Sequence, residues 1–229
     1  MSFEFIEKNL NDLKAKIAQE SQLCQRELNS VQLLPVTKNH SLNKLEFLYS
    51  LGERQFAENR VQELNEKAAQ MPADITWHLI GTLQSNKVKA ALEFASVIHS
   101  VDSLKLLRRI DRIAAELGKK PSILLQVNIS EEETKSGFKV DDIAEAVKTA
   151  EQLTEIRLIG FMTMAPAQAS DKEIFQYFDQ LRLIKEQYQS QNPEITQLSM
   201  GMSADFPTAI KAGSTCIRVG TAIMGERDY

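Results

Sequence analysis

Strand-like and helix-like segments alternate along this chain with regular spacing, and this alternation limits its possible folds more than any other feature. Eight apolar segments of strand length are separated by stretches with helical periodicity. They cover residues 32–38, 54–59, 76–81, 96–102, 122–129, 156–164, 197–202 and 216–223. Because repeated strand–helix units build a parallel sheet covered by helices, the pattern predicts an α/β protein.

The number of units favours a closed barrel. The clearest helical patterns cover 103–117, 140–153 and 172–189, and the chain has 229 residues, close to the roughly 250 residues of a typical (β/α)8 barrel. A doubly wound open sheet is the alternative, but no glycine-rich phosphate loop follows the first strand. We predict a single TIM-type barrel domain over residues 1–229, with an extra amphipathic helix near its N-terminus.

Composition excludes several classes of protein. With 43% hydrophobic and 25% charged residues, the chain is typical of a soluble globular domain. Its net charge of -4 gives no general attraction to nucleic acid or to anionic membranes, and no segment is long enough to span a bilayer. Cys24 and Cys216 lack the spacing of metal ligands. We therefore expect a cytoplasmic protein without a disulfide framework, a metal site, a membrane or a nucleic-acid partner.

The first strand, "LLPVTK", is an apolar run that ends in a lysine. Side chains alternate along a strand, so Leu34, Val36 and Lys38 share one face. If this face lines the barrel, Lys38 points inward at the carboxyl end of the strand, where barrel enzymes place their sites. The alternative is that Lys38 marks the end of the strand and extends to water.

The last strand, "CIRVG", directs Arg218 and Gly220 inward by the same alternation, and strands one and eight are neighbours in a closed barrel. Lys38 and Arg218 would then face one cavity, which favours a neutral lysine amine and an anionic ligand. A neutral amine can form an imine with an aldehyde, and the anion is most simply a phosphate. The fifth strand would add Gln126 and Asn128 to the same polar mouth.

Two loops supply groups suited to a phosphate. Ser203 precedes an expected helix start, with Asp205 as a competing cap and Pro207 suited to the first turn. Gly220 permits close approach of the backbone, and Thr221 adds a hydroxyl. Taken one at a time, Ser203 could equally be an N-cap and Gly220 a bend; their combination with Lys38 and Arg218 favours a phosphate site.

Six segments, in order and spacing, carry a family resemblance: "LLPVTK", "FAENRVQE", "WHLIGTLQSNK", "VNISEEETKSGF", "LSMGMSADF" and "IRVGTAIMG". Over nearly its whole length the chain resembles the pyridoxal-phosphate homeostasis protein family. The resemblance implies one (β/α)8 barrel, similar to the barrel domain of alanine racemase, that binds pyridoxal 5'-phosphate as an internal aldimine.

The resemblance also implies roles for particular residues. Lys38 matches the imine lysine, Arg218 the arginine that faces the pyridine nitrogen, and Asn59 an asparagine that lines the cofactor. The phosphate cup matches Ser203, Gly220 and Thr221. The chain has Ala57, Glu58 and Asn59 where the family usually has "GEN", and Arg60 and Thr82 also depart from the family pattern. These departures place in question the contacts near Asn59 and the shape of one loop.

The same resemblance implies a cofactor carrier that buffers free pyridoxal phosphate, with apo-enzymes as acceptors. An arginine opposite the ring nitrogen leaves the cofactor a weak electron sink, and the sequence ends at Tyr229 without the second domain from which alanine racemases bring an opposing tyrosine. We therefore expect a monomer with no catalytic residue and no robust activity. The alternatives are a small amino-acid racemase or related enzyme that depends on pyridoxal phosphate, and a Schiff-base aldolase.

Overall fold

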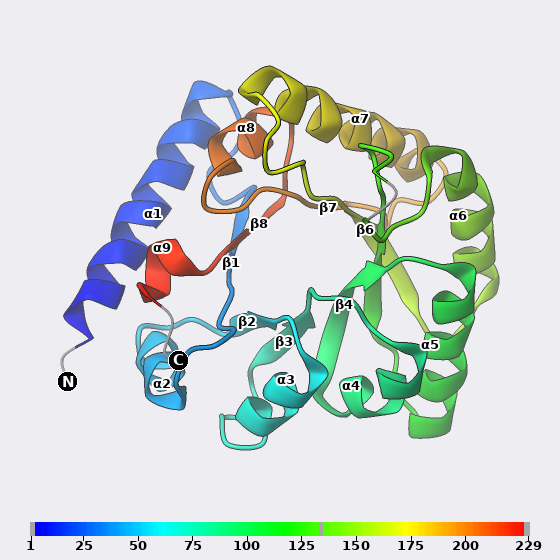
Figure 1. Cartoon of the computed structure of the whole chain (residues 1–229), viewed down its shortest axis with the longest axis horizontal. Coiled ribbons are helices and arrows are strands. Elements are labelled where there is room, and N and C mark those ends of the chain that lie inside the picture. Colours follow the sequence, from blue (N-terminus) through cyan, green and yellow to red (C-terminus); the bar gives the residue numbers. More distant parts are fainter. Residues whose placement is uncertain (1–2, 133–134, 227–229) are drawn as a thin grey trace.

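The computed structural model describes residues 3–132 and 135–226 and contains an eight-stranded parallel sheet that curls into a nearly closed (β/α)8 barrel (Figure 1). The strands are β1 (Gln32–Pro35), β2 (Gln55–Glu58), β3 (Thr76–Leu79), β4 (Ala95–Val101), β5 (Ser122–Gln126), β6 (Arg157–Met162), β7 (Gln197–Ser199) and β8 (Cys216–Val219). Their hydrogen-bonded order is β1-β8-β7-β6-β5-β4-β3-β2. The predicted barrel is confirmed, and β1 and β8 are neighbours as expected.

The barrel closes between β1 and β2 through a narrow contact. A single parallel bridge joins Val36 to Ala57, and the Thr37 N–H donates to the Ala57 carbonyl at 2.9 Å. On the other side, the Val36 N–H donates to the Val219 carbonyl at 2.8 Å. These bonds fix the backbone immediately before Lys38, so the seam of the barrel also determines where that lysine emerges.

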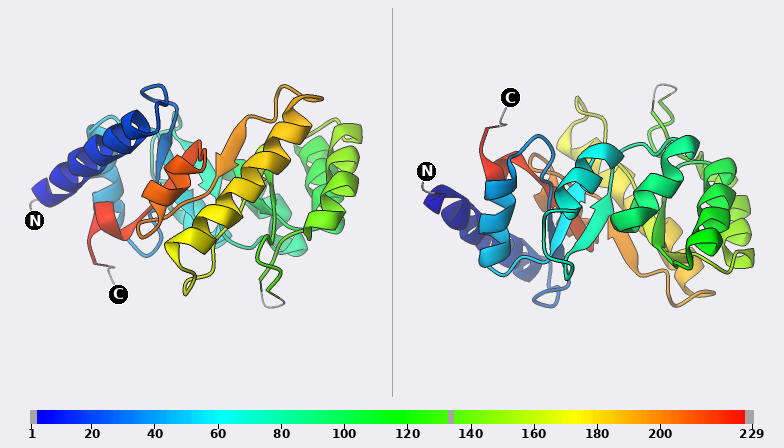
Figure 2. Two further views of the ribbon diagram at one scale, coloured as in Figure 1. Left: turned by 90° about the horizontal axis from the view of Figure 1, so that it is seen from above. Right: turned by 90° about the horizontal axis from the view of Figure 1, so that it is seen from below.

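Helices cover the outside of the barrel (Figures 1 and 2). They are α1 (Glu4–Leu23), α2 (Leu42–Ser50), α3 (Val61–Ala68), α4 (Val88–Phe94), α5 (Leu104–Leu117), α6 (Ile143–Gln152), α7 (Asp171–Gln189), α8 (Phe206–Lys211) and α9 (Thr221–Met224), with the 3-10 turns η1 (Ser85–Lys87) and η2 (Val140–Asp142). The N-terminal helix α1 lies beside α8 and α9 at one end of the molecule, while α5 and α6 form the opposite end.

The extra N-terminal helix is confirmed, although residues 1 and 2 lie outside the described part of the chain. Its buried residues include Ile6, Leu10, Leu13 and Ile17, which recur at steps of three and four and so form one apolar stripe. The Asn9 side chain donates to the Ile223 carbonyl at 3.2 Å and links α1 to α9. The helix therefore supports the short segment that follows β8.

Helix boundaries follow the predictions more closely than strand boundaries. Ser103 caps α5 by accepting from the Leu106 N–H, and Ser170 forms a capping box with Glu173 at the start of α7. The strand predicted over 216–223 is wrong beyond Val219, because the backbone at Gly220 leaves the extended region and the next residues form α9.

Two apolar cores lie on opposite sides of the sheet. The larger one fills the space between the strands and the surrounding helices. The smaller one, inside the barrel, contains Leu34, Val36, Ala57 and Cys216, with Ile80 packed against it. Leu34 and Val36 therefore face inward, as the alternation predicts. In the described part of the chain, no helix combines the length and apolar character needed to cross a bilayer.

Candidate functional site

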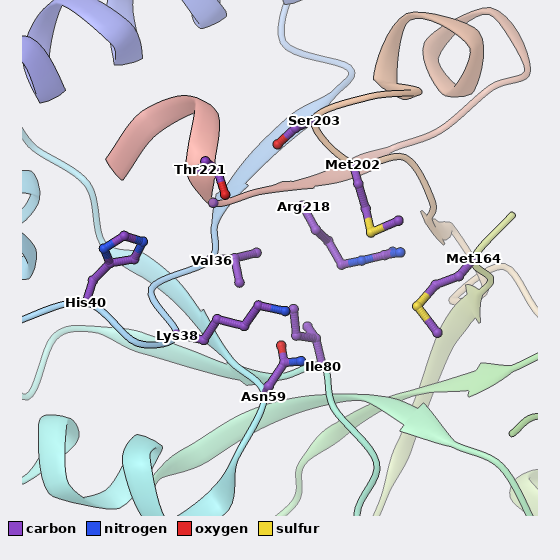
Figure 3. A pocket seen from close by; sticks show the side chains of 11 residues that line it. Val36, Lys38, His40, Asn59, Ile80, Met164, Met202, Ser203, Arg218 and Thr221 are labelled. Carbon is purple, nitrogen blue, oxygen red and sulfur yellow. The ribbon is translucent and has the colours of Figure 1, made fainter. Parts of the chain in front are cut away.

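A pocket of about 200 Å³ opens at the carboxyl ends of the strands. Its walls come from segments far apart in the sequence, which the barrel brings together (Figure 3). The lining residues are Val36, Lys38, His40, Asn59, Ile80, Met164, Met202, Ser203, Arg218, Gly220 and Thr221. All six predicted site residues are among them, and their roles toward a ligand stay predictions.

Lys38 enters this pocket from the turn that follows β1. The side chain is half-buried, and Figure 3 shows it extending into the space beside Asn59 and Ile80. Arg218, on the neighbouring strand β8, lines the same pocket. The alternative in which Lys38 only extends to water is therefore wrong, because the amine lies within a walled cavity.

Arg218 is a buried cation that is 4% exposed. Its guanidinium donates to Ser199 Oγ at 2.6 Å and to the Thr163 carbonyl at 3.1 Å. Within the described residues, no carboxylate forms an ion pair with it, and burial lowers its pKa from the usual value. Since a buried charge is costly without a counter-ion, the arrangement favours an anionic or strongly accepting ligand.

The hydroxyl groups of Ser203 and Thr221 lie together at one end of the pocket (Figure 3), and Thr221 directly follows Gly220, which also lines it. A Cβ atom at Gly220 would lie 3.0 Å from the Val36 carbonyl oxygen, so glycine permits the close approach of β8 to β1 there. Asp205 accepts from the Met202 N–H at 2.6 Å and holds the loop that carries Ser203.

Of the two residues that could cap the helix after this loop, Ser203 and Asp205, the structure uses Asp205. Asp205, the competing cap, occupies the N-cap position of α8, and Pro207 lies in its first turn. Ser203 lies further upstream and is exposed, with its side chain at the pocket wall. The interpretation of Ser203 as an N-cap is therefore wrong, and Ser203 instead forms part of the pocket wall.

Asn59 carries an unused acceptor. Its Oδ1 atom is buried and has no hydrogen-bond partner among the described residues, which is a costly arrangement unless a ligand or water binds there. The two residues near Asn59 that depart from the family pattern lie outside the pocket. Ala57 packs in the inner core, and Arg60 is exposed at the start of α3. Neither lines the pocket, whereas Asn59 does.

Two predicted pocket residues have another role. Gln126 donates to the Ser136 carbonyl at 2.7 Å, and Asn128 donates to the carbonyls of Glu132 and Lys135. Both side chains fasten the loop between β5 and η2, and neither lines the pocket. The expectation that they contribute to the polar mouth is wrong, because the loop folds back over its own strand and uses their polar groups.

A buried ionic cluster next to the turn that carries Lys38 was missed by the sequence reasoning. Lys67 Nζ donates to Glu58 Oε1 at 2.8 Å, to Glu63 Oε1 at 2.7 Å and to the Thr37 carbonyl at 2.7 Å. Glu63 also accepts from the Asn39 N–H at 2.6 Å. The cluster therefore holds the backbone on both sides of Lys38. The charged residues of "FAENRVQELNEK" are the signal that could have indicated it.

His40 is a further lining residue that sequence reasoning did not assign to the pocket. It is buried, and its Nδ1 atom lies 3.5 Å from Lys44 Nζ on α2. Figure 3 shows the ring at the edge of the pocket, turned away from the amine of Lys38. No sequence motif singles out this histidine, because its position depends on the turn after β1.

Comparison with known proteins finds similar sequences and a similar solved structure. Residues 9–228 match the family model described as the alanine racemase N-terminal domain. A protein of Vibrio alginolyticus named pyridoxal phosphate homeostasis protein is 39% identical over 98% of each chain, and one of the same name from Synechocystis is 40% identical over 86% of this chain and 92% of its own. The structure of PipY from Synechococcus elongatus with PLP bound is similar with a TM-score of 0.80 and 41% identity, over 91% of this chain and all of that one.

Proposed function

The chain belongs to the pyridoxal phosphate homeostasis protein family, and on this premise we propose that it binds pyridoxal 5'-phosphate through Lys38 and acts as an intracellular carrier of the cofactor. One observation carries the proposal: a single pocket joins the amine of Lys38, the buried guanidinium of Arg218 and the hydroxyls of Ser203 and Thr221. These groups match the aldehyde, the ring nitrogen and the phosphate of that cofactor in turn.

The residues present fit the cofactor. The amine of Lys38 is placed to condense with the aldehyde and release water, which gives an imine. Ser203, Thr221 and the close backbone at Gly220 offer donors to the phosphate, and the unused Asn59 Oδ1 offers an acceptor near the ring substituents. Arg218 supplies N–H groups for the ring nitrogen, and its buried positive charge, which has no ion-pair partner among the described residues, favours an anionic ligand.

A carrier fits this pocket better than an efficient catalyst. Pyridoxal phosphate, when bound, supplies an electron sink, and the sink is strongest when a carboxylate keeps the ring nitrogen protonated. Arg218 does not give up its proton readily and leaves that nitrogen unprotonated. Lys38 and His40 are the described lining residues that could exchange protons, and His40 lies at the edge, turned away from the amine.

We further propose that the protein works as a cytoplasmic monomer that passes the cofactor to apo-enzymes. Both cysteines are free, and Cys216 is buried inside the barrel. Burial raises the pKa of the Cys216 thiol to about 11, so the thiol stays neutral and unreactive. The support for a reducing compartment is that neither cysteine forms a disulfide.

The hydroxyl end of the pocket gives a prediction about phosphate recognition. The double variant Ser203→Ala, Thr221→Ala should weaken binding of pyridoxal phosphate while leaving pyridoxal binding nearly unchanged, because pyridoxal lacks the phosphate. Each hydrogen bond to a charged group contributes roughly 1.5–3 kcal/mol. Titration with both ligands, followed by absorbance, measures the difference. Equal losses for the two ligands would show that these residues support the fold and do not recognise the phosphate.

The carrier and racemase interpretations differ in what happens at the α-carbon of an amino acid. Cofactor-loaded protein incubated with L-alanine in deuterated water should change its absorbance spectrum, because the substrate amine can displace Lys38 from the cofactor. It should not incorporate deuterium at Cα, since the unprotonated ring nitrogen makes the cofactor a weak electron sink, and it should not invert the alanine, since racemisation requires a proton donor on each face of that carbon. NMR and chiral analysis of the alanine measure this. Deuterium uptake over many cofactor equivalents would contradict the carrier proposal and favour a racemase.

A further inference from the structure

A row of hydrogen-bonded side chains runs through the interior of the barrel and ends at Arg218. Arg218 donates to Ser199 Oγ, which lies 2.7 Å from His99 Nδ1. His99 Nε2 lies 2.9 Å from His78 Nδ1, and His78 Nε2 lies 3.0 Å from Gln55 Oε1. The row joins strands β8, β7, β4, β3 and β2. Neither histidine lines the pocket, so the row lies behind the arginine.

The proton on each member of the row follows from its acceptor end. Gln55 Oε1 can only accept, so His78 must carry its proton on Nε2. A neutral His78 then accepts at Nδ1, which requires the proton of His99 to be on Nε2. The Nδ1 atom of His99 is left as an acceptor for the Ser199 hydroxyl. Ser199 Oγ therefore turns a lone pair, and not its hydrogen, toward Arg218.

Burial supports neutral rings in both histidines. His78 is 5% exposed and His99 2% exposed. Burial lowers the pKa of His78 to about 3, and burial together with His78 and Arg218 lowers the pKa of His99 well below its usual value. A proton added to either ring would make His99 Nδ1 a donor to Ser199 Oγ and place a second positive charge in the buried row that ends at Arg218. Neutral rings thus keep every group in the row satisfied.

We infer that His78, His99 and Ser199 are positioning residues that set the orientation of Arg218 toward the ring nitrogen of the bound cofactor. The inference rests on the proposed function. A guanidinium has five N–H donors in a rigid plane. One donor of Arg218 bonds to Ser199 Oγ at the end of the row, and a second bonds to the Thr163 carbonyl. The plane is thereby fixed, and the remaining donors are left for the ligand. Because Arg218 keeps its proton, the row orients this group and does not conduct protons.

Ring-nitrogen recognition can be separated from general stability with two ligands. Pyridoxal phosphate and its 1-deaza analogue, which has carbon in place of the ring nitrogen, share every other group. His99→Phe should weaken binding of pyridoxal phosphate about tenfold, the scale of one hydrogen bond, and change binding of the analogue little. His99→Asn, whose Oδ1 can still accept from Ser199, should recover part of the loss. Ile98→Val, on the opposite face of β4, is the matched control and should affect neither ligand.

Equal losses for both ligands in His99→Phe would overturn the inference, because they would indicate a purely structural role. A second measurement needs no variant: nitrogen-15 NMR of the histidine rings in the cofactor-free protein should show both His78 and His99 neutral, with the proton on Nε2. A proton on Nδ1 of either ring would overturn the row. If the wild-type protein binds neither ligand, the proposed function fails and the orientation toward a ring nitrogen fails with it, while the ring protons still decide whether the row holds Arg218 as described.

Discussion

Lys38→Ala is expected to abolish the covalent adduct that borohydride traps when the protein is loaded with pyridoxal phosphate. Reduction converts an imine into a stable secondary amine, so the adduct marks the lysine that reacted. Lys38 is the described lysine that lines the pocket, and the turn that carries it is held by the Lys67 cluster. Mass spectrometry of digested, reduced protein should place the whole of the adduct on the peptide that contains Lys38.

The variant should still fold, because Lys38 is half-buried at the pocket wall and its removal opens no cavity in either apolar core. Thermal unfolding of the cofactor-free protein checks this. Lys87→Ala, at an exposed lysine of η1, is the matched control and should retain the full adduct. An adduct that persists in Lys38→Ala, or that maps to another lysine in the wild type, would contradict the assignment of the pocket.

The barrel and the inward direction of Lys38 and Arg218 could be predicted because both depend on local periodicity. Alternation along "LLPVTK" and "CIRV" decides which side chains share a face, and the number of strand–helix units decides that β1 and β8 meet. The boundary of the last strand could not be predicted in the same way. The segment after Val219 is as apolar as a strand, and only the backbone at Gly220 shows that a helix begins there.

The interior partners were less predictable, because their contacts join residues that are distant in sequence. His99 and Ser199 are 100 positions apart, yet their side chains lie 2.7 Å from one another. Asn128 appeared to belong to the pocket from its strand face alone, but the following loop returns and takes up its amide. Strand alternation gives the side of the sheet on which a residue lies. It does not give the partner, which depends on strand tilt and loop path.

Lys67→Met is expected to destabilise the protein by about 3–5 kcal/mol near neutral pH, the cost of leaving a buried charge without its partner. Methionine keeps the length of the side chain but loses the charge and all three hydrogen bonds. Glu58, which is 0% exposed, would retain the Thr37 hydroxyl at 2.6 Å. Its Oε2 atom already lacks a partner among the described residues. Chemical denaturation of the cofactor-free protein measures the change.

The loss should depend on pH with a definite sign. Burial raises the pKa of Glu58 in the folded wild type, and Lys67 opposes that rise, so removing Lys67 raises the pKa further. A carboxyl whose pKa is higher in the folded state than in the unfolded state favours folding at low pH, and this contribution disappears as the pH rises through the folded pKa. The gap in unfolding free energy between variant and wild type should therefore be smallest in acid and widen toward neutral pH.

Lys14→Met provides the matched control, because Lys14 forms a 2.6 Å ion pair with Glu53 but is 50% exposed in its side chain. Exposed pairs contribute at most about 1 kcal/mol, so this variant should stay close to the wild type at every pH. The double variant Lys67→Met, Glu58→Gln should regain part of the lost stability, since it removes the buried carboxylate as well. If Lys67→Met cost no more than Lys14→Met, the cluster would not hold the Lys38 turn. A large loss together with weaker cofactor binding is the result expected if the backbone around Lys38 is fixed by Lys67 and Glu63.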